Sequence, residues 1–292
     1  MPRLLLVLVI GLLAVGAAAC GSDDDESSNQ SGTSAGETAA PAADACSKDQ
    51  LTLISPGTLT VGTDKPAFPP YFEKDDPTNG RGFESAVAYA IADELGFSKD
   101  EVKWTVVPFN SSFAPGPKKF DFDINQISIT PKRAERVDFS TPYYTSPQAV
   151  LALKSTPAAS ATSLAELADA KLGVQVGTTS LDAVTEVIKP KTQPQVFNDS
   201  NDTVRALKTK RVDAIVTDLP TAFFLTAVEV PEAKISGQFQ APGGDDWGLV
   251  LGKNSELTAC VNQALGALRD SGELQEITDK WMGDQAGAPA LQ

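Results

Sequence analysis

Short apolar runs alternate with longer amphipathic stretches along most of the chain. In its first part, β-rich runs predict strands at residues 58–63, 102–107 and 120–127. Between the first two runs, apolar residues recur at every fourth position over residues 83–96. This spacing predicts an amphipathic helix that ends at Gly96.

A second alternating set begins after Pro147. It predicts strands at residues 149–154, 171–176, 193–197 and 212–218, and helices at residues 163–170, 180–188, 200–210 and 220–228. One more strand at residues 247–253 and a closing helical pair at residues 257–283 complete the pattern. Alternation of this kind favours the α/β class with largely parallel sheets.

The two alternating sets predict two α/β lobes in one chain. We expect residues 46–146 and 243–292 to form lobe 1, and residues 147–242 to form lobe 2. The chain then leaves lobe 1, builds lobe 2 and returns. Its two crossings form a two-strand hinge, which we expect near residues 146–150 and 241–247.

The N-terminal segment is typical of an export signal. Arg3 precedes an apolar run, and three alanines stand directly before Cys20. This ending resembles a bacterial lipobox, although that pattern usually has leucine where Ala17 stands. We therefore expect a lipoprotein signal peptide at residues 1–19 and lipid on Cys20; ordinary cleavage after Ala19 is the alternative. Residues 20–45 are acidic, without aromatic or branched aliphatic residues, and predict a disordered tether.

Composition excludes several classes of function. The formal net charge of −14 argues against DNA or RNA as a partner. The chain has no histidine, which removes Ser-His-Asp and Cys-His catalysis and the commonest metal ligand. In an exported protein, Cys46 and Cys260 favour a disulfide, with two separate buried thiols as the alternative. We expect neither a metal nor a cofactor.

Polar, aromatic and glycine residues follow the ends of the predicted strands. In open α/β sheets, ligands bind outside the carboxyl ends of the strands. The residues found there are Asp64, Phe68, Ser128, Thr130, Arg133, Gly177, Thr178, Thr179 and Asp218. These residues are therefore candidates for a binding site. For Arg133 the alternative is a solvated arginine at a helix start, and for Asp218 it is a helix N-cap.

Six segments, in this order along the chain, resemble those of a known protein family: GTLTVGTD, GFESAVAYAIADELG, ISITPKRAERVDFSTPYY, LGVQVGTTS, RVDAIVTDLPTA and LRDSGELQEITDKWMG. Over nearly all of residues 56–283, the chain resembles the polar amino-acid solute-binding proteins of bacterial ABC importers. The resemblance implies the type II periplasmic binding protein fold, with two α/β lobes joined by a two-strand hinge.

The resemblance also implies a role for each candidate residue. Arg133 matches the arginine that binds the ligand's α-carboxylate, and its two parallel donors suit a planar carboxylate. Asp218 matches the acid that takes the α-ammonium group. The other matches are Ser128, Thr130, Thr178 and Thr179 for contacts with the α-amino and α-carboxylate groups, Phe68 and Phe109 (or Phe113 in place of Phe109) for aromatic walls, and Asp64 for side-chain selection.

Polar residues in the expected strand at residues 120–127 depart from the family. Alternation along a strand places Asp121, Asp123 and Asn125 on one face. A buried unpaired charge is costly, so either this face is wet or Asp123 pairs with a cation from the protein or the ligand. We expect Asn125 and Gln126 to narrow the pocket and to select a polar or cationic side chain.

The resemblance implies a binding protein and not an enzyme. We expect a monomer, anchored by Cys20 to the outer face of the bacterial cytoplasmic membrane, that captures a free polar or cationic α-amino acid by hinge closure. It would deliver this ligand to an ABC permease in the membrane. A dehydratase acting on a cyclic carboxylate with the same fold, and a sensor or adhesin with the same fold, are the alternatives.

Overall fold

The computed structural model describes residues 43–283 and 287–292. The expected signal peptide at residues 1–19, the lipidation site Cys20 and nearly all of the tether at residues 20–45 lie outside the described residues. In the part of the chain that is described, no helix is both long and apolar enough to span a bilayer.

The first lobe is built on a five-stranded sheet in the order β2-β1-β3-β12-β4. Its strands are β1 (Leu59–Thr63), β2 (Val102–Val106), β3 (Phe122–Asp123), β4 (Asp138–Phe139) and β12 (Val250–Leu251). Strand β1 is parallel to β2 and β3, whereas β12 is antiparallel to β3 and β4. Three helices pack against this sheet: α1 (Phe83–Glu94), α7 (Leu257–Asp270) and α8 (Glu273–Met282). Two short helices lie in the loops that connect its strands: α2 (Phe109–Ser112) and α3 (Pro131–Ala134).

The second lobe is built on another five-stranded sheet, in the order β10-β6-β9-β7-β8. Its strands are β6 (Gln148–Leu153), β7 (Leu172–Gln175), β8 (Gln195–Phe197), β9 (Ala214–Asp218) and β10 (Ala233–Phe239). Strand β6 is antiparallel to both neighbours, and β7 is parallel to both of its own. Both sheets are therefore mixed, and the expectation of largely parallel sheets is wrong.

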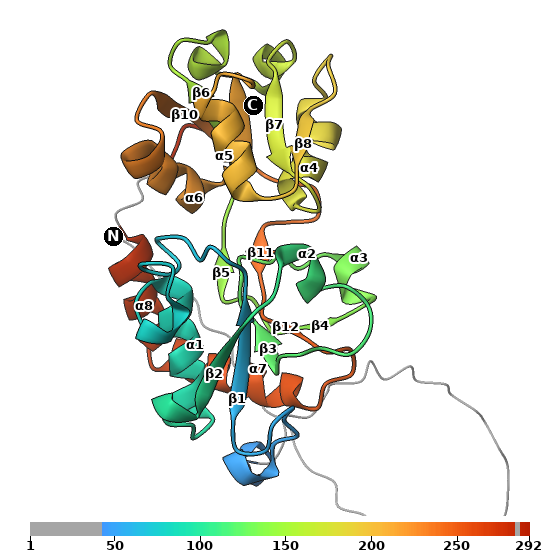
Figure 1. Cartoon of the computed structure of the whole chain (residues 1–292), viewed down its shortest axis with the longest axis vertical. Coiled ribbons are helices and arrows are strands. Elements are labelled where there is room, and N and C mark those ends of the chain that lie inside the picture. The colour runs from blue at the N-terminus through green and yellow to red at the C-terminus, as the bar shows by residue number, and fades with distance from the viewer. Residues whose placement is uncertain (1–42, 284–286) are drawn as a thin grey trace, which may run out of the picture. The chain divides into compact units, whose positions relative to one another are not determined.

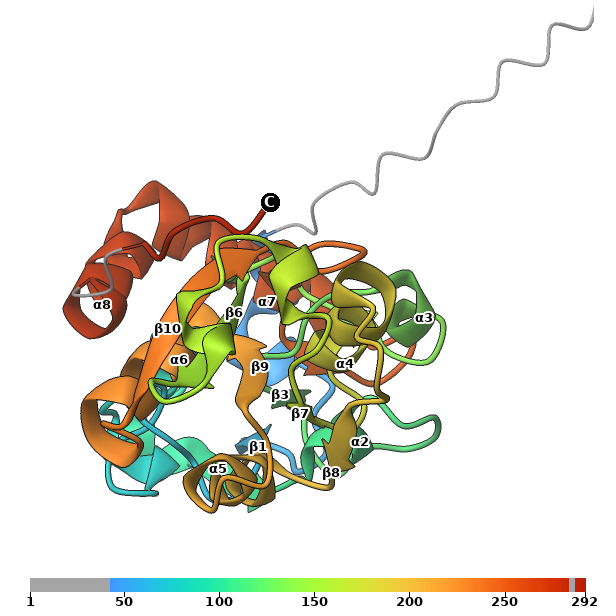
Figure 2. The same cartoon turned by 90° about the horizontal axis from the view of Figure 1, so that it is seen from above.

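Helices cover both faces of the second sheet (Figure 2). One apolar cluster joins Val150 of β6 to Ala183 of α4 (Thr179–Ala183). Another joins Leu151, the next residue of β6, to α5 (Ser200–Lys208) and α6 (Leu219–Phe224). The alternation of side chains along a strand thus divides the core into two layers.

A small antiparallel pair, β5 (Tyr144–Thr145) and β11 (Asp246–Trp247), joins the lobes, and Figure 1 shows it between the two larger sheets. Trp247 is fully buried there, with the ring of Tyr144 5.0 Å and the ring of Tyr71 5.6 Å from its own. The two chain crossings therefore meet around a rigid aromatic cluster.

Three expected elements differ from the structure. Residues 120–127 contain only the two-residue strand β3, and residues 163–170 contain only a 3-10 turn (Leu164–Leu167). The strand expected at residues 247–253 is divided between β11 and β12. Strand β10 was not expected at all, because Ser236, Gly237 and Gln238 interrupt its apolar pattern and the pairing with β6 shifts register there.

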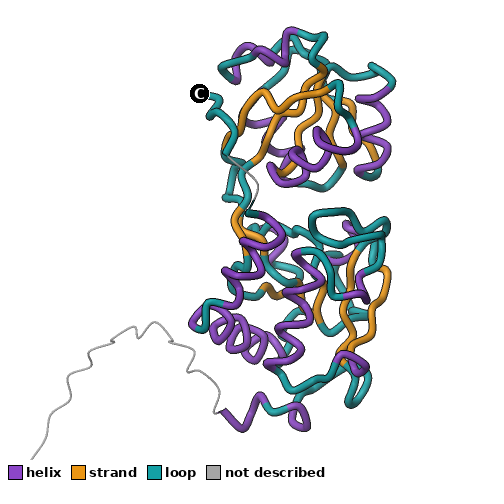
Figure 3. Tube along the Cα trace, turned by 90° about the vertical axis from the view of Figure 1, so that its left-hand side faces the viewer, coloured by secondary structure: helices purple, strands orange, loops and turns teal. Residues whose placement is uncertain are grey.

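The last residues of the chain pack against lobe 2, and not against lobe 1 as expected. Residues 243–292 were expected in lobe 1, but Leu291 is buried in a core cluster of lobe 2. Ala290 bridges to Gln238 of β10, and the backbone amide of Leu291 donates to the carbonyl of Gln238 at 2.9 Å. Figure 3 shows the C-terminus beside the lobe that carries this sheet. The tail covers the edge strand β10.

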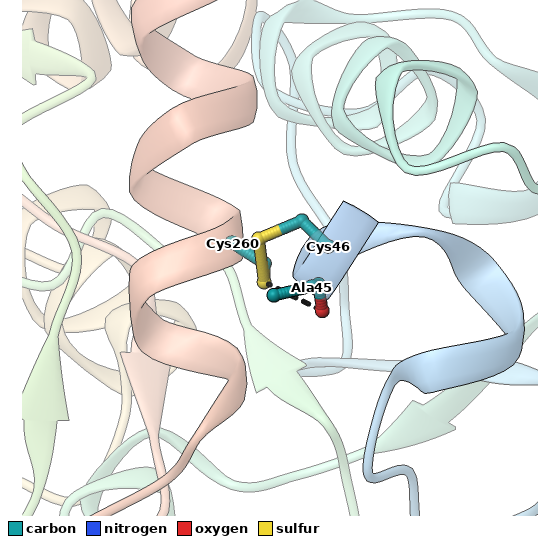
Figure 4. The surroundings of a disulfide bond; sticks show 3 residues. All are labelled: Ala45, Cys46 and Cys260. Carbon is teal, nitrogen blue, oxygen red and sulfur yellow. Dashed lines mark hydrogen bonds between the residues drawn. A yellow bond between two sulfur atoms is a disulfide. The ribbon is translucent and has the colours of Figure 1, made fainter. Parts of the chain in front are cut away.

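Cys46 and Cys260 form a disulfide, as the sequence predicts, with Cα atoms 5.2 Å apart. Cys46 ends a 3-10 turn (Ala43–Cys46), and Cys260 lies on α7 (Figure 4). The bond fixes the start of the described chain to lobe 1.

Candidate functional site

A pocket is lined by residues of both lobes. Nine of the ten predicted binding residues line it: Asp64, Phe68, Phe109, Gln126, Ser128, Arg133, Thr178, Thr179 and Asp218. Thr130 is the exception among them, because its hydroxyl accepts a hydrogen bond from the backbone amide of Arg133 at 3.3 Å and caps α3. The local role of Thr130 is therefore to start the helix that carries Arg133.

Arg133 is buried, with 7% of its surface exposed, so the interpretation as a solvated arginine is wrong. Its Nη1 donates to the carbonyl oxygen of Ser128 at 2.6 Å, and its Nη2 donates to that of Gly177, in lobe 2, at 2.8 Å. Burial lowers the pKa of Arg133 to about 10, which leaves the guanidinium charged at neutral pH. The side chain thus brings a positive charge to the junction of the lobes.

Two phenylalanines stack on this guanidinium. The Arg133 Cζ lies 4.5 Å from the ring centre of Phe113 and 5.6 Å from that of Phe109. Phe109 lines the pocket and Phe113 does not. Of the two alternatives, Phe109 therefore lies at the pocket wall, and Phe113 supports Arg133 from behind.

Asp218 ends β9 and stands at the N-cap position of α6, but its side chain makes no capping hydrogen bond. One oxygen instead accepts from Nε2 of Gln148 at 2.7 Å. Burial raises the pKa of Asp218 to about 7, and the negative charge of Asp245 adds to the shift. A cationic group that entered the pocket would stabilise its ionised form.

Hydroxyl and amide groups bridge the lobes around the pocket. Ser128 Oγ and Thr179 Oγ1 are 3.2 Å apart, and Tyr71 Oη and Thr221 Oγ1 are 2.9 Å apart. Nδ2 of Asn110 donates to the carbonyl oxygen of Val176 at 3.3 Å. These contacts join residues distant in sequence, and they define a closed arrangement of the lobes.

Acidic side chains outnumber basic ones in the pocket lining. The acids are Asp64, Asp199, Asp218 and Glu229, and the bases are Lys65 and Arg133. Burial raises the pKa of Asp64, and the negative charge of Asp199 raises it further, so the two carboxylates that line the pocket from different lobes repel each other. Two such carboxylates favour the binding of a ligand with a positively charged group.

Asp199 and Glu229 are pocket residues that the sequence interpretation missed. Asp199 lies two residues after the end of β8 and caps α5 by accepting from the backbone amide of Asp202 at 2.8 Å. The rule that ligands lie beyond strand ends would have identified it, had it been applied to residues 193–197. Glu229 ends a helical segment and pairs with Lys208, so no strand end marks it.

Gln126 lines the pocket, but its amide group turns towards lobe 1. Both its backbone amide and its Nε2 donate to the carboxylate of the fully buried Glu84, which also accepts from the hydroxyl of Tyr143. Burial raises the pKa of Glu84 to about 7 despite these donors. Gln126 has a φ of 50°, a left-handed conformation that these hydrogen bonds hold in place.

Asp123 and Asn125 are buried polar residues of the segment at residues 120–127. Asp123 is fully buried, and neither of its oxygens has a hydrogen-bond partner among the described residues. Of the alternatives for Asp123, pairing with a protein cation is therefore excluded among the described residues, which leaves a wet face or a cation of the ligand. Burial raises the pKa of Asp123 well above its usual range. Asn125 lines the pocket, and its Nδ2 is buried without a partner in the described part of the chain.

Within residues 43–283 and 287–292, no three acidic or thiol side chains converge to hold a metal ion. The chemistry of the pocket is instead that of charge pairing and hydrogen bonding, with one guanidinium, several carboxylates and a set of hydroxyls. Such a set suits a small molecule that carries both charges.

Comparison with known proteins identifies the family. The model of the bacterial extracellular solute-binding proteins, family 3, matches residues 59–284. The chain belongs to this family. Its two lobes have the type II periplasmic binding protein fold, as the resemblance implied.

Relatives of this solute-binding protein cover most of its length. The L-cystine-binding protein TcyJ of Escherichia coli is 29% identical over 230 residues, which are 78% of this chain and 83% of TcyJ. A probable histidine-binding protein of Campylobacter jejuni is 33% identical over 228 residues, covering 77% of this chain and 84% of that one. The structure of an ancestral arginine-binding protein bound to glutamine is 35% identical, with a TM-score of 0.67, and covers 78% of this chain and 98% of the other.

Proposed function

We propose that this protein captures a cationic α-amino acid, such as L-arginine, between its two lobes. The observation that carries the proposal is a pocket that combines one buried guanidinium with four carboxylates from both lobes. A free amino acid with a basic side chain offers one carboxylate and two positive groups. Its charges complement those of the pocket.

The main-chain end of the ligand is proposed to lie between Arg133 and Asp218. A guanidinium has five N–H donors, and two of those of Arg133 are used by backbone carbonyls. The remaining donors suit the ligand's α-carboxylate, and the hydroxyls of Thr178 and Thr179 lie on the facing lobe. Asp218 is proposed to take the α-ammonium group, which restores the charge balance of a buried acid.

The side-chain end is proposed to lie between Asp64 and Asp199. Asp64 comes from lobe 1 and Asp199 from lobe 2, and neither forms an ion pair among the described residues. A guanidinium or ammonium group between them would replace a repulsion by two attractions. The names of the arginine-binding and probable histidine-binding relatives support this ligand class.

Hinge closure is the proposed mechanism of capture. Ligand groups on one lobe complete their contacts only when the other lobe approaches, so the ligand binds the closed state more tightly than the open one. This difference in affinity shifts the population towards closure. The closed form is then proposed to be the state that an ABC permease accepts.

Export and anchoring belong to the same proposal. Membership of an extracellular family agrees with a signal peptide at residues 1–19, and we propose lipid attachment at Cys20 and the outer face of the cytoplasmic membrane as the location. Metabolic labelling with a radioactive fatty acid tests the anchor. Label should appear in the wild-type protein and be absent from the Cys20→Ser variant; label in both would contradict lipidation of this residue.

A thermal-shift screen of the twenty amino acids tests the ligand class. Because a ligand that binds only the folded state raises the melting temperature, we expect arginine, lysine or histidine to give the largest rise. The Arg133→Ala variant should lose it. A largest rise with leucine or phenylalanine would contradict the cationic class.

We also propose that the ligand leaves the protein unchanged. Some proteins with this fold are dehydratases, and the same guanidinium would suit a cyclic carboxylate. Incubation with prephenate or arogenate should therefore give no aromatic product. The formation of product, and its loss in the Asp218→Asn variant, would favour the enzymatic alternative.

A further inference from the structure

Gln148 connects the pocket to the hinge. It is the first residue of β6, follows the first chain crossing and is completely buried. Its Nε2 donates to Asp218 at 2.7 Å and, more weakly, to Asp245 at 3.4 Å. Its Oε1 accepts from the hydroxyl of Ser180, at the start of α4, at 2.6 Å. Every polar atom of this amide group is therefore used, although Gln148 does not line the pocket.

Asp245 belongs to the second chain crossing. It is 2% exposed, its side chain accepts from the backbone amide of Ala241 at 3.2 Å, and its carbonyl accepts from the amide of Ser146 at 3.0 Å. Gly243 and Gly244, just before it, have φ values of 86° and 96°, with no neighbouring atoms where a Cβ would stand. This segment has the conformational freedom that a hinge needs.

Two carboxylates therefore share one neutral amide. Burial is the main cause that raises the pKa of Asp218; the hydrogen bond from Gln148 lowers it, the charge of Asp245 raises it and the charge of Arg133 lowers it. Glu84 is a further acid that raises the pKa of Asp218. The negative charge of Asp218 in turn adds to the rise that burial causes in the pKa of the buried Tyr71 and of the half-buried Tyr144. The acid of the hinge and the acid of the pocket thus share one buried hydrogen-bond donor.

We propose that Gln148 is a positioning residue that holds Asp218 ready for the ligand's α-ammonium group and couples this contact to Asp245 in the hinge. The proposal rests on the proposed function, since it assumes that Asp218 takes the ammonium group. The positive charge of the ligand's ammonium group offsets the negative charge of ionised Asp218 and so reduces its repulsion of Asp245, which lets the two crossings draw together around Gln148. Binding in the pocket thereby stabilises the closed hinge.

Titration of Asp218 in the ligand-free full chain tests the coupling directly. Carboxyl carbon chemical shifts are followed by NMR, with the Asp218 signal assigned by its loss in Asp218→Asn. Asp245→Asn should lower the midpoint of Asp218 by about half a pH unit or more, because it removes a negative charge. Gln148→Met should raise the midpoint by a similar amount, because it removes the donor to the ionised form. Asp246→Asn is the matched control: its carboxylate accepts from Thr145 Oγ1, and its charge raises the pKa of Asp245 but is not a cause of the shift of Asp218.

Ser180→Ala provides a second route if Gln148→Met does not fold. It removes the donor that orients the Gln148 amide, and the Asp218 midpoint should rise by a smaller amount. An unchanged midpoint in both Asp245→Asn and the Gln148 or Ser180 variant would overturn the proposal. Equal shifts in Asp246→Asn would overturn it as well.

Binding of L-arginine is the second readout. At pH 6, Asp245→Asn should bind arginine more tightly than the wild type, because more of Asp218 is ionised. Gln148→Met should bind about tenfold more weakly at pH 7 and reach its full affinity only at higher pH. A purely structural role predicts weaker binding in both variants with an unchanged pH profile, and that result would overturn the coupling. If the wild type bound no basic amino acid, the proposed ligand would be wrong, whereas the NMR titration would still decide the coupling.

Discussion

Glu84 is an acid that the protein buries completely, at the back of the pocket residue Gln126. Its pKa of about 7 lies above the ordinary 4.5, so the folded state favours the protonated form more than the unfolded state does. The contribution of this group to stability is therefore full below pH 4.5 and is lost as the pH rises to about 7. The loss amounts to about 3 kcal/mol.

Glu84→Gln should remove this pH dependence. A neutral amide imitates the protonated carboxyl, so the variant and the wild type should have similar free energies of unfolding at pH 4.5. At pH 8 the variant should be more stable, by up to about 3 kcal/mol. Urea denaturation at both pH values measures the difference. If the free energies of unfolding of the variant and the wild type changed equally between pH 4.5 and pH 8, Glu84 would not be a neutral buried group.

Asp218 should make ligand binding pH-dependent. Its pKa of about 7 in the ligand-free protein means that the carboxylate form, which takes an ammonium group, is a minor species at pH 5. Affinity for L-arginine should therefore rise at least about tenfold from pH 5 to pH 7.5. Titration calorimetry across this range measures it. The Asp218→Asn variant is the control, because it should bind weakly at every pH and lose the slope.

The sequence predicted which residues line the candidate site, but not which buried groups form hydrogen bonds with them. Strand ends and the family resemblance together pointed to Arg133, Asp218 and the threonines, because these residues lie at or beyond the ends of expected strands. Neither signal reports which buried groups meet in three dimensions. The hydrogen bonds of Glu84 to Gln126 and of Gln148 to Asp245 join residues that are 42 and 97 positions apart, and no local pattern marks them.

At the scale of elements, long periodic segments were predicted well and short irregular ones were not. Helices α1, α5, α7 and α8 occupy nearly the expected residues, since each carries a sustained apolar face. The expected strand at residues 120–127 is mostly irregular backbone, because Gln126 adopts a left-handed conformation to reach Glu84. Tertiary hydrogen bonds thus override the local strand pattern.

The turn before α4 is a point of direct contact between the two lobes. Gly177 has a φ of 78°, and a Cβ at this position would lie 1.9 Å from Oδ1 of Asn110, in lobe 1. Gly177→Ala should therefore hinder closure and weaken L-arginine binding by about tenfold or more. Titration calorimetry measures the effect.

Asn110→Ala provides the matched test of this clash. Alone, it removes only one long hydrogen bond, to the carbonyl oxygen of Val176, and should change affinity little. In combination with Gly177→Ala, it should restore part of the lost affinity, since the obstructing side chain is gone. If the double variant binds no better than Gly177→Ala, the loss comes from backbone strain and not from obstructed closure.

For the molecule as a whole, the Cys46–Cys260 disulfide closes a loop of 214 residues that contains nearly the whole folded chain. Chain-entropy arguments assign such a loop about 5 kcal/mol of stabilisation. Cys46→Ser/Cys260→Ser should therefore lower the urea midpoint strongly. Because neither cysteine lines the pocket, L-arginine affinity at 25 °C should stay unchanged. An unchanged midpoint would contradict a stabilising bond, and lost affinity would place the disulfide in the binding mechanism.

The central claim concerns two charged residues from different lobes that hold one ligand. Titration calorimetry of L-arginine at pH 7.5 tests it most directly, with the wild type, Arg133→Ala and Asp218→Asn compared. We expect one ligand per chain for the wild type and a loss of at least about a hundredfold in affinity for each variant, because each leaves a ligand charge unpaired. Wild-type affinity in either variant would show that the ligand binds elsewhere.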